Sequence, residues 1–204
     1  MLQKRYTIFY GWVVVGAAGF MLFGSTGTRF SFGAFMKPMT NEFGWGREDL
    51  SLVFGLTVLM AGMVRPAVGI LADRYGGKRL ALPGMLLAAA MLALVPMVDN
   101  LAQLYAVYIP MAFGFSLAEP PIFTKMVSSW FNRQRGLALG LTNAGSGFGS
   151  AIILPVSVVM VTFLSWREAY FMLAGVIAIF VVPIGWRYLK ESPRQMGLLP
   201  DGEV

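Results

Sequence analysis

A short basic connection between two long apolar stretches reads Gly69-Ile70-Leu71-Ala72-Asp73-Arg74-Tyr75-Gly76-Gly77-Lys78-Arg79. The flanking stretches, 50–72 and 80–98, are each long enough to cross about 30 Å of hydrocarbon as an α-helix. The pattern therefore predicts two membrane-spanning helices that are joined by a tight turn.

The residue types in this connection have separate physical uses. A glycine at position 69 would let a neighbouring helix approach closely, and Gly76 and Gly77 permit a tight reversal of the chain. Asp73 falls at a helix end, where its charge can meet an Arg or the positive N-terminus of another helix. Basic side chains would anchor the turn on the cytoplasmic side. Composition alone also allows a plain basic loop.

The composition of the whole chain points to a membrane protein. Of its 204 residues 57% are hydrophobic and 13% are charged, against about 25% charged in an ordinary soluble domain. Mean hydropathy is +0.67. The chain has no Cys and no His, which excludes disulfides, thiol nucleophiles, the usual zinc sites and histidine acid–base catalysis. We therefore expect no catalytic site, no metal and no cofactor.

Six apolar stretches follow one another along the chain, and each is long enough to span a bilayer. A spanning segment must satisfy its own backbone hydrogen bonds, and these stretches lack the alternation of barrel strands. We predict an all-α membrane protein with six transmembrane helices, at 9–36, 50–72, 80–98, 101–128, 136–163 and 168–189.

The distribution of basic residues predicts the orientation, because short loops rich in Lys and Arg stay in the cytoplasm. With the N-terminus inside, the outer connections carry only Lys37, Arg47 and Arg167. The inner segments carry Lys4, Arg5, Arg74, Lys78, Arg79, Arg133, Arg135, Arg187, Lys190 and Arg194. We expect both termini in the cytoplasm and a lipid bilayer as partner. The isoelectric point near 9.8 then reflects topology, and we expect no nucleic-acid partner.

The connection at 69–79 closely resembles the signature between helices two and three of the major facilitator superfamily. Two further stretches look like the monocarboxylate and oxalate/formate transporter branches: Tyr10-Gly11-Trp12-Val13-Val14-Val15 and Trp130-Phe131-Asn132-Arg133-Gln134-Arg135-Gly136-Leu137-Ala138-Leu139-Gly140. The monocarboxylate pattern has an acidic residue before the first glycine, where this chain has Phe9 and Tyr10. That departure favours the bacterial organic-anion branch.

The resemblance implies a particular architecture. Such transporters have two six-helix halves, each built from two inverted three-helix repeats, with substrate bound near the midplane between the halves. The chain would be an N-terminal half: a domain at 1–190, with repeats at about 1–98 and 99–190, and a cytoplasmic linker that starts at 191–204. A C-terminal half would be its missing partner, and the bacterial inner membrane its location. The resemblance also makes 69–79 a gating loop, with Gly69, Asp73, Arg74, Gly76, Lys78 and Arg79 as its residues.

Arg29 is a charge inside the first apolar stretch. Such a charge costs at least about 2.5–3.5 kcal/mol at a helix centre, so it is a functional candidate by default. Ser25 and Thr26 lie one turn earlier on its face. A guanidinium is well shaped to hold a carboxylate through paired hydrogen bonds. We predict a substrate site of Arg29, Thr26, Ser25, Tyr108 and Asn143; the alternatives for Arg29 are snorkelling to the surface and a structural ion pair.

Glu119 is the only acid well inside the predicted helices, and Pro120 and Pro121 follow it. Two prolines bend a helix and free backbone carbonyls, which is tolerable beside a polar cavity. Glu119 is a candidate proton carrier or the partner of Arg65 in a structural pair, and Arg65 is also a candidate for the cytoplasmic gate.

The fifth stretch carries a polar stripe, Asn143, Ser146 and Ser150, and the string Gly145-Ser146-Gly147-Phe148-Gly149. The string follows no strand and lies in an apolar span, so it predicts close helix packing rather than a nucleotide loop.

The function these observations favour is secondary active transport of small organic anions, mono- or dicarboxylates, by alternating access. The alternative is a non-transporting or truncated six-helix module that needs a partner half. A membrane-embedded enzyme is disfavoured, because no catalytic motif is present.

Overall fold

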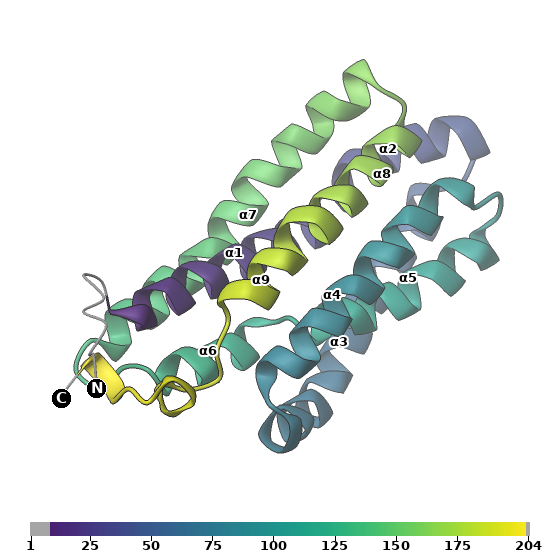
Figure 1. Ribbon diagram of the computed structural model, residues 1–204. Coiled ribbons are helices and arrows are strands. Elements are labelled where there is room, and N and C mark those ends of the chain that lie inside the picture. The colour runs from purple at the N-terminus through teal and green to yellow at the C-terminus, as the bar shows by residue number, and fades with distance from the viewer. Residues whose placement is uncertain (1–8, 203–204) are drawn as a thin grey trace.

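The computed structural model describes residues 9–202, and this part of the chain is helical with no strand (Figure 1). Six of its helical stretches are long and apolar enough to cross a membrane. These six spans are Tyr10–Phe43, Arg47–Tyr75, Gly77–Met97, Leu101–Ser128, Arg135–Phe163 and Trp166–Tyr188. The prediction of an all-α fold with six transmembrane helices is confirmed.

Three spans are interrupted. The first consists of α1 (Tyr10–Phe30) and α2 (Phe32–Phe43), and the fourth of α5 (Leu101–Ser116) and α6 (Pro120–Ser128). The sixth consists of α8 (Trp166–Val176), a π-helical turn (Ile177–Val181) and α9 (Val182–Tyr188). The second span is α3 (Arg47–Tyr75) and the fifth is α7 (Arg135–Phe163), while the third is α4 (Gly77–Leu94) with a short 3₁₀ turn at Val95–Met97.

The predicted end of the first span, at residue 36, was too early. Polar residues from Lys37 onward read as a loop, but α2 continues to Phe43 and ends at Gly44, which has φ +69°. The helix persists because its apolar side chains, Phe32, Phe35 and Met39, are buried on one face, so polar residues occupy the other.

The bundle has two distinct ends. We call the end that carries Arg74, Lys78, Arg79, Arg133 and Arg135 the basic end. At the opposite end, the side chains of Trp166 and Arg167 both donate hydrogen bonds to Glu42, at 2.6 and 2.5 Å, and so tie the start of α8 to the end of α2. Ser165 and Glu168 cap α8 reciprocally: the Glu168 N–H donates to Ser165 Oγ, and the Ser165 N–H donates to the Glu168 carboxylate.

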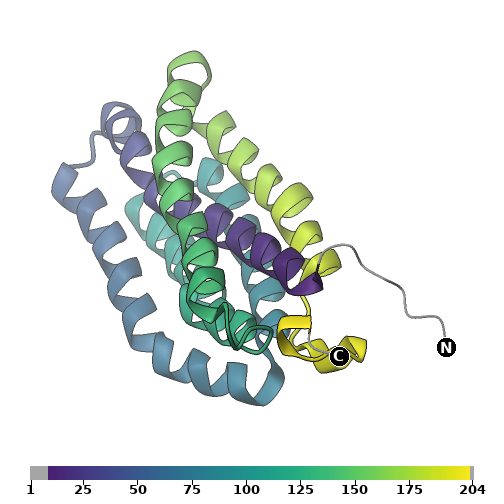
Figure 2. The ribbon, with the colours of Figure 1, turned by 90° about the vertical axis from the view of Figure 1, so that its left-hand side faces the viewer.

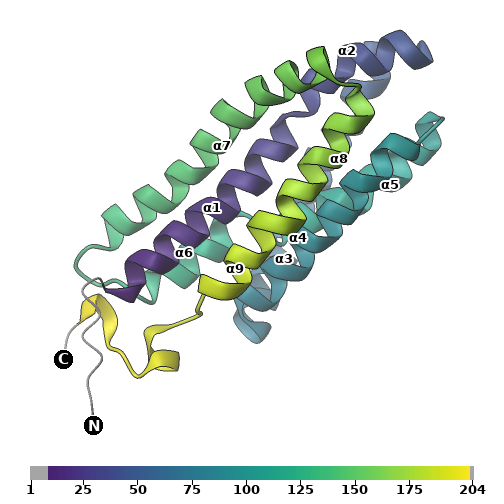
Figure 3. The ribbon, with the colours of Figure 1, turned by 45° about the horizontal axis from the view of Figure 1, so that its top comes forward.

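Helices α1 and α7 run side by side through the bundle (Figures 2 and 3). A Cβ atom at Gly145 would lie 2.1 Å from the Gly19 carbonyl oxygen, and one at Gly149 would lie 2.3 Å from the Phe23 carbonyl oxygen. Only glycine allows the two backbones to come this close. The predicted close packing is confirmed at Gly145 and Gly149, whereas Gly147 faces open space.

We expect Gly145→Ala to lower the free energy of unfolding by about 2 kcal/mol, because the added methyl group must push α1 and α7 apart. Thermal unfolding in detergent measures the effect. Gly147→Ala is the matched control, since no heavy atom lies within 4 Å of its added Cβ; it should raise stability by up to about 1 kcal/mol through helix propensity. Equal unfolding midpoints for the two variants would contradict this packing.

Candidate substrate-binding site

The fourth span breaks between Ser116 and Pro120. Glu119 is extended there, with φ −99° and ψ 164°, because a residue that precedes proline avoids the helical region. The sequence predicted a bent helix at this point, and the structure shows a break. Ser25 Oγ on α1 donates a hydrogen bond of 3.1 Å to the Ala118 carbonyl oxygen, so α1 satisfies one backbone group that the break frees.

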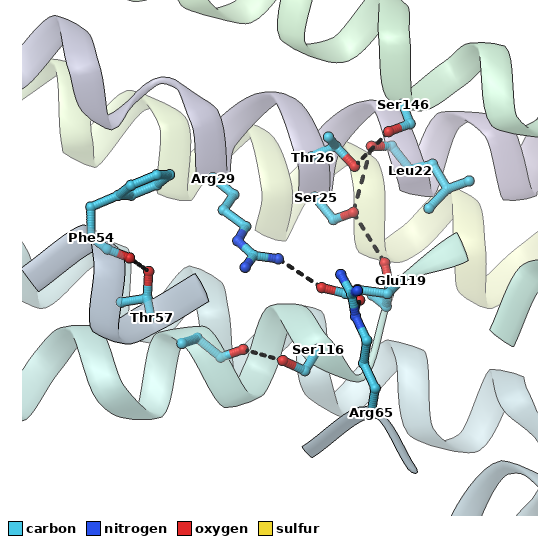
Figure 4. Close-up of polar contacts among 12 residues, drawn as sticks. Leu22, Ser25, Thr26, Arg29, Phe54, Thr57, Arg65, Ser116, Glu119 and Ser146 are labelled. Carbon is cyan, nitrogen blue, oxygen red and sulfur yellow. Dashed lines mark hydrogen bonds and ion pairs between the residues drawn. The ribbon is translucent and has the colours of Figure 1, made fainter. Parts of the chain in front are cut away.

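Two arginines share the carboxylate of Glu119 (Figure 4). Arg29 Nη1 on α1 donates to Oε1 at 2.7 Å, and Arg65 Nε on α3 donates to Oε2 at 2.5 Å. The side chains of Glu119 and Arg29 are only 8% and 13% exposed, whereas that of Arg65 is 55% exposed. This cluster of two cations and one anion carries one excess positive charge.

A pocket of about 230 Å³ opens beside the charge cluster. It is lined by Ser25, Thr26, Arg29, Phe30, Val58, Arg65, Phe115, Glu119, Pro120 and Ser146. Across it Ser146 Oγ on α7 donates to Thr26 Oγ1 at 3.1 Å (Figure 4). Guanidinium and hydroxyl donors beside apolar walls suit a small organic anion.

Two residues of the predicted site do not line this pocket. Tyr108 is buried and its hydroxyl is 2.6 Å from that of Tyr170; both border a separate cavity of about 20 Å³, which Arg29 also lines. Asn143 donates its side-chain N–H to the Leu139 carbonyl oxygen of its own helix. Ser146, from the same polar stripe, forms a hydrogen bond to α1 instead. Nothing in the sequence signalled Tyr170, an aromatic residue in an apolar span.

The turn between α3 and α4 forms at Gly76, whose φ of +91° favours glycine. The predicted reversal is confirmed there. Gly77 serves packing instead: it begins α4, and a Cβ on it would lie 2.6 Å from Ile122 Cγ2. Lys78 Nζ donates to the carbonyl oxygens of Trp186 and Leu189, at 2.6 and 2.9 Å, and so joins this turn to the end of α9.

Other expectations for this loop need correction. Within residues 9–202, Asp73 pairs with the side chain of Lys125 on α6 rather than with an Arg or a helix N-terminus. Gly69 admits no close neighbour within residues 9–202, since nothing lies within 4 Å of a Cβ built there. The Arg74 guanidinium carbon lies 5.4 Å from the centre of the Tyr75 ring, and Arg79 is exposed. Arg74 and Arg79 lie at the basic end of the bundle.

No group of three acidic side chains in the described part of the chain is arranged to hold a metal ion. The charged groups of the pocket are two guanidiniums and one carboxylate, which suits anion binding rather than cation binding.

The fold and the pocket together define a helical membrane protein with an anion-compatible site between its spans. The chain belongs to the Major Facilitator Superfamily, whose family model matches residues 10–203. This confirms the resemblance that the connection at 69–79 indicated.

Three relatives illustrate the similarity. The chain is 27% identical over 184 residues to the uncharacterized MFS-type transporter YcxA of Bacillus subtilis, covering 89% of this chain and 45% of that protein. It is 31% identical over 158 residues to the probable L-galactonate transporter of Escherichia coli, covering 77% of this chain and 34% of that protein. It is 29% identical over 173 residues to monocarboxylate transporter 3 of Mus musculus, covering 82% of this chain and 34% of that protein. The chain thus spans less than half the length of these relatives, which are transporters and not enzymes.

We expect Glu119→Gln to lower the free energy of unfolding by about 3 kcal/mol, because it leaves the buried Arg29 without a counter-charge. Arg65→Gln should cost less than about 1 kcal/mol, because an ion pair with a half-exposed partner is worth little. Thermal unfolding of the purified variants compares the two. A larger loss of unfolding free energy for Arg65→Gln than for Glu119→Gln would contradict the prediction that the more buried charge matters more for stability.

Proposed function

We propose that the chain is the N-terminal half of a secondary active transporter that moves small organic anions, mono- or dicarboxylates, by alternating access. One observation carries the proposal: a single carboxylate serves two arginines at an open pocket, which leaves one positive charge for a ligand. The names of two relatives, a probable L-galactonate transporter and a monocarboxylate transporter, support the same substrate class.

The exposures of the two arginines suggest how an anion binds. Arg65 is half exposed and meets an entering carboxylate first, while Arg29 lies deeper against Glu119. The hydroxyls of Thr26 and Ser146 add donors from α1 and α7. We keep Ser25, Thr26 and Arg29 in the proposed site and omit Tyr108 and Asn143, since neither lines the pocket.

The substrate and Glu119 compete for the same guanidinium groups. In an exchange mechanism Glu119 forms its ion pairs with both arginines again when the anion leaves, so the empty site keeps its geometry. In a proton-coupled mechanism Glu119 accepts a proton and releases the arginines to the substrate. Uptake measured across a pH series in wild type and in Glu119→Gln separates the two: a flattened profile assigns the proton to Glu119, and an unchanged profile assigns it a fixed counter-ion role.

A second six-helix half completes the proposed transporter. The chain covers 34–45% of the three relatives' lengths, which fits one half of a twelve-helix fold. We place the basic end in the cytoplasm of a bacterium, with both termini inside, because Lys and Arg gather at that end. Residues 1–190 form the membrane domain of this proposal, and the segment after it starts the linker between halves.

The alternative is a six-helix module that does not transport by itself, which the same partial coverage favours. Counterflow in proteoliposomes with a panel of carboxylates distinguishes the two. Uptake by the complete gene product together with none by the 204-residue chain alone identifies a half that needs its partner.

We expect Arg29→Ala in the complete gene product to reduce carboxylate counterflow at least tenfold, since the loss of a charge-assisted contact costs more than about 1.4 kcal/mol. Arg47→Ala, at an exposed helix start away from the pocket, is the matched control and should transport normally. Membrane insertion of both variants is checked by extraction and gel filtration. Normal counterflow by inserted Arg29→Ala would remove Arg29 from the substrate site.

A further inference from the structure

The segment after α9 folds back beneath the bundle. Residues 189–202 contain two short 3₁₀ turns, Pro193–Met196 and Pro200–Gly202, with a reversal at Gly197, whose φ is +67°. In Figure 3 this yellow segment lies under the ends of α1, α6 and α9. Its polar contacts reach two loops that are far apart in the sequence.

The first contact is with the turn between α3 and α4. The Glu191 carboxylate accepts hydrogen bonds from the backbone N–H groups of Gly77 and Lys78, at 3.1 and 2.6 Å. These are the first N–H groups of α4, which have no partner within the helix, and a negative charge is favoured at that end. A Cβ on Gly76 would lie 2.8 Å from Glu191 Oε1, so the turn is shaped around this carboxylate.

The second contact is with the end of α6. Ser129 Oγ donates to the Glu191 carbonyl oxygen at 2.8 Å, and Trp130 Nε1 donates to the Lys190 carbonyl oxygen at 3.1 Å. The side chains of Trp130 and Leu189 are fully buried there. The segment is therefore packed as well as hydrogen bonded.

In the third contact, Asp201 of this segment binds the loop between α6 and α7. Its carboxylate accepts from the backbone N–H groups of Asn132 and Arg133, at 2.7 and 2.9 Å, and its own N–H donates to the Trp130 carbonyl oxygen at 2.9 Å. Asp201 has φ +56°, and no other non-glycine residue within 9–202 has a positive φ. Asp tolerates this conformation better than most residues, but it is adopted only where contacts hold it.

We propose that residues 189–202 form a clamp that ties the α3–α4 turn to the α6–α7 loop, and that Asp201 is the positioning residue that closes it. Glu191 accepts hydrogen bonds from backbone N–H groups of the α3–α4 turn, and Asp201 accepts them from the α6–α7 loop. Because both carboxylates belong to one segment, the loss of one contact loosens the segment that carries the other. The clamp makes the basic end of the half a single body. That rigidity serves alternating access if the proposed transport holds, but the clamp itself does not depend on it.

The charge state of Asp201 agrees with a clamp that is closed at neutral pH. Hydrogen bonds from the backbone N–H of Arg133, and then those of Asn132 and Gln134, hold the pKa of Asp201 below its usual range. Arg133 lines the pocket beside Asp201 and adds a favourable charge. A lowered folded pKa means that the contribution is complete above the unfolded value and disappears only as pH falls through the folded one.

Hydrogen exchange of the 204-residue chain in lipid nanodiscs tests the clamp amide by amide. In Asp201→Ala we expect the amides of Asn132 and Arg133 to exchange about tenfold faster, because they lose a charged acceptor. The amides of Gly77 and Lys78 should exchange at least about twofold faster, although nothing near them is mutated. Asp201→Asn keeps an oxygen acceptor and should lie between wild type and Asp201→Ala.

Asp99→Ala, an exposed acid at the opposite end of the bundle, is the matched control and should show wild-type rates. Protected amides in α1 and α7 verify that each variant is folded. Unchanged exchange at Asn132 and Arg133 in Asp201→Ala would overturn the role of Asp201. Faster exchange there with no change at Gly77 and Lys78 would overturn the clamp. Neither outcome depends on transport, so a failure of the clamp is distinct from a failure of the proposed function.

Discussion

The carboxylate of Glu119, held between two guanidinium groups, is the interaction on which the interior of this bundle depends. Each charge inside a membrane span costs at least about 2.5–3.5 kcal/mol when alone. Here one anion from the broken fourth span meets a cation from the first span and a cation from the second. Those three spans are thereby held in register at the depth where the pocket opens.

The break that presents Glu119 is tolerated only because α1 supports it. Two prolines remove helical hydrogen bonds, and Ser25 satisfies the Ala118 carbonyl that the break exposes. Helix α1 in turn holds its position because Gly145 and Gly149 let α7 pack against its backbone. The same contact brings Ser146 to Thr26. Packing, backbone satisfaction and pocket chemistry thus depend on one another.

The basic end follows a different rule, because a charge at the end of a membrane span costs less than a charge at its centre. Backbone N–H groups at helix and loop starts are held by acidic side chains from the segment after α9. The sequence placed Glu191 and Asp201 in a linker and predicted no contact for either, because an acid in a polar tail is usually solvated. Their contacts exist only because the tail returns to the bundle.

The length of the apolar stretches and the polar residues between them were enough to locate the six spans. A chain that crosses lipid must present an apolar surface and satisfy its own backbone hydrogen bonds. Some local geometry was also predictable from the sequence, because the reversal at Gly76 needs glycine and the two prolines after Glu119 interrupt a helix. The continuation of α2 past residue 36 was not predictable from the sequence, because its polar residues are compatible with a loop until the buried face of the helix is known.

Which partner a polar side chain finds across the bundle is decided by tertiary structure alone. The sequence supplied Arg29, Arg65 and Glu119, but only the packing of three spans made one carboxylate serve both arginines. Packing also placed Lys125 beside Asp73 and left Gly69 without a close neighbour among the described residues. Helix periodicity assigns a residue to a face, whereas the rotation and crossing of helices decide what that face meets.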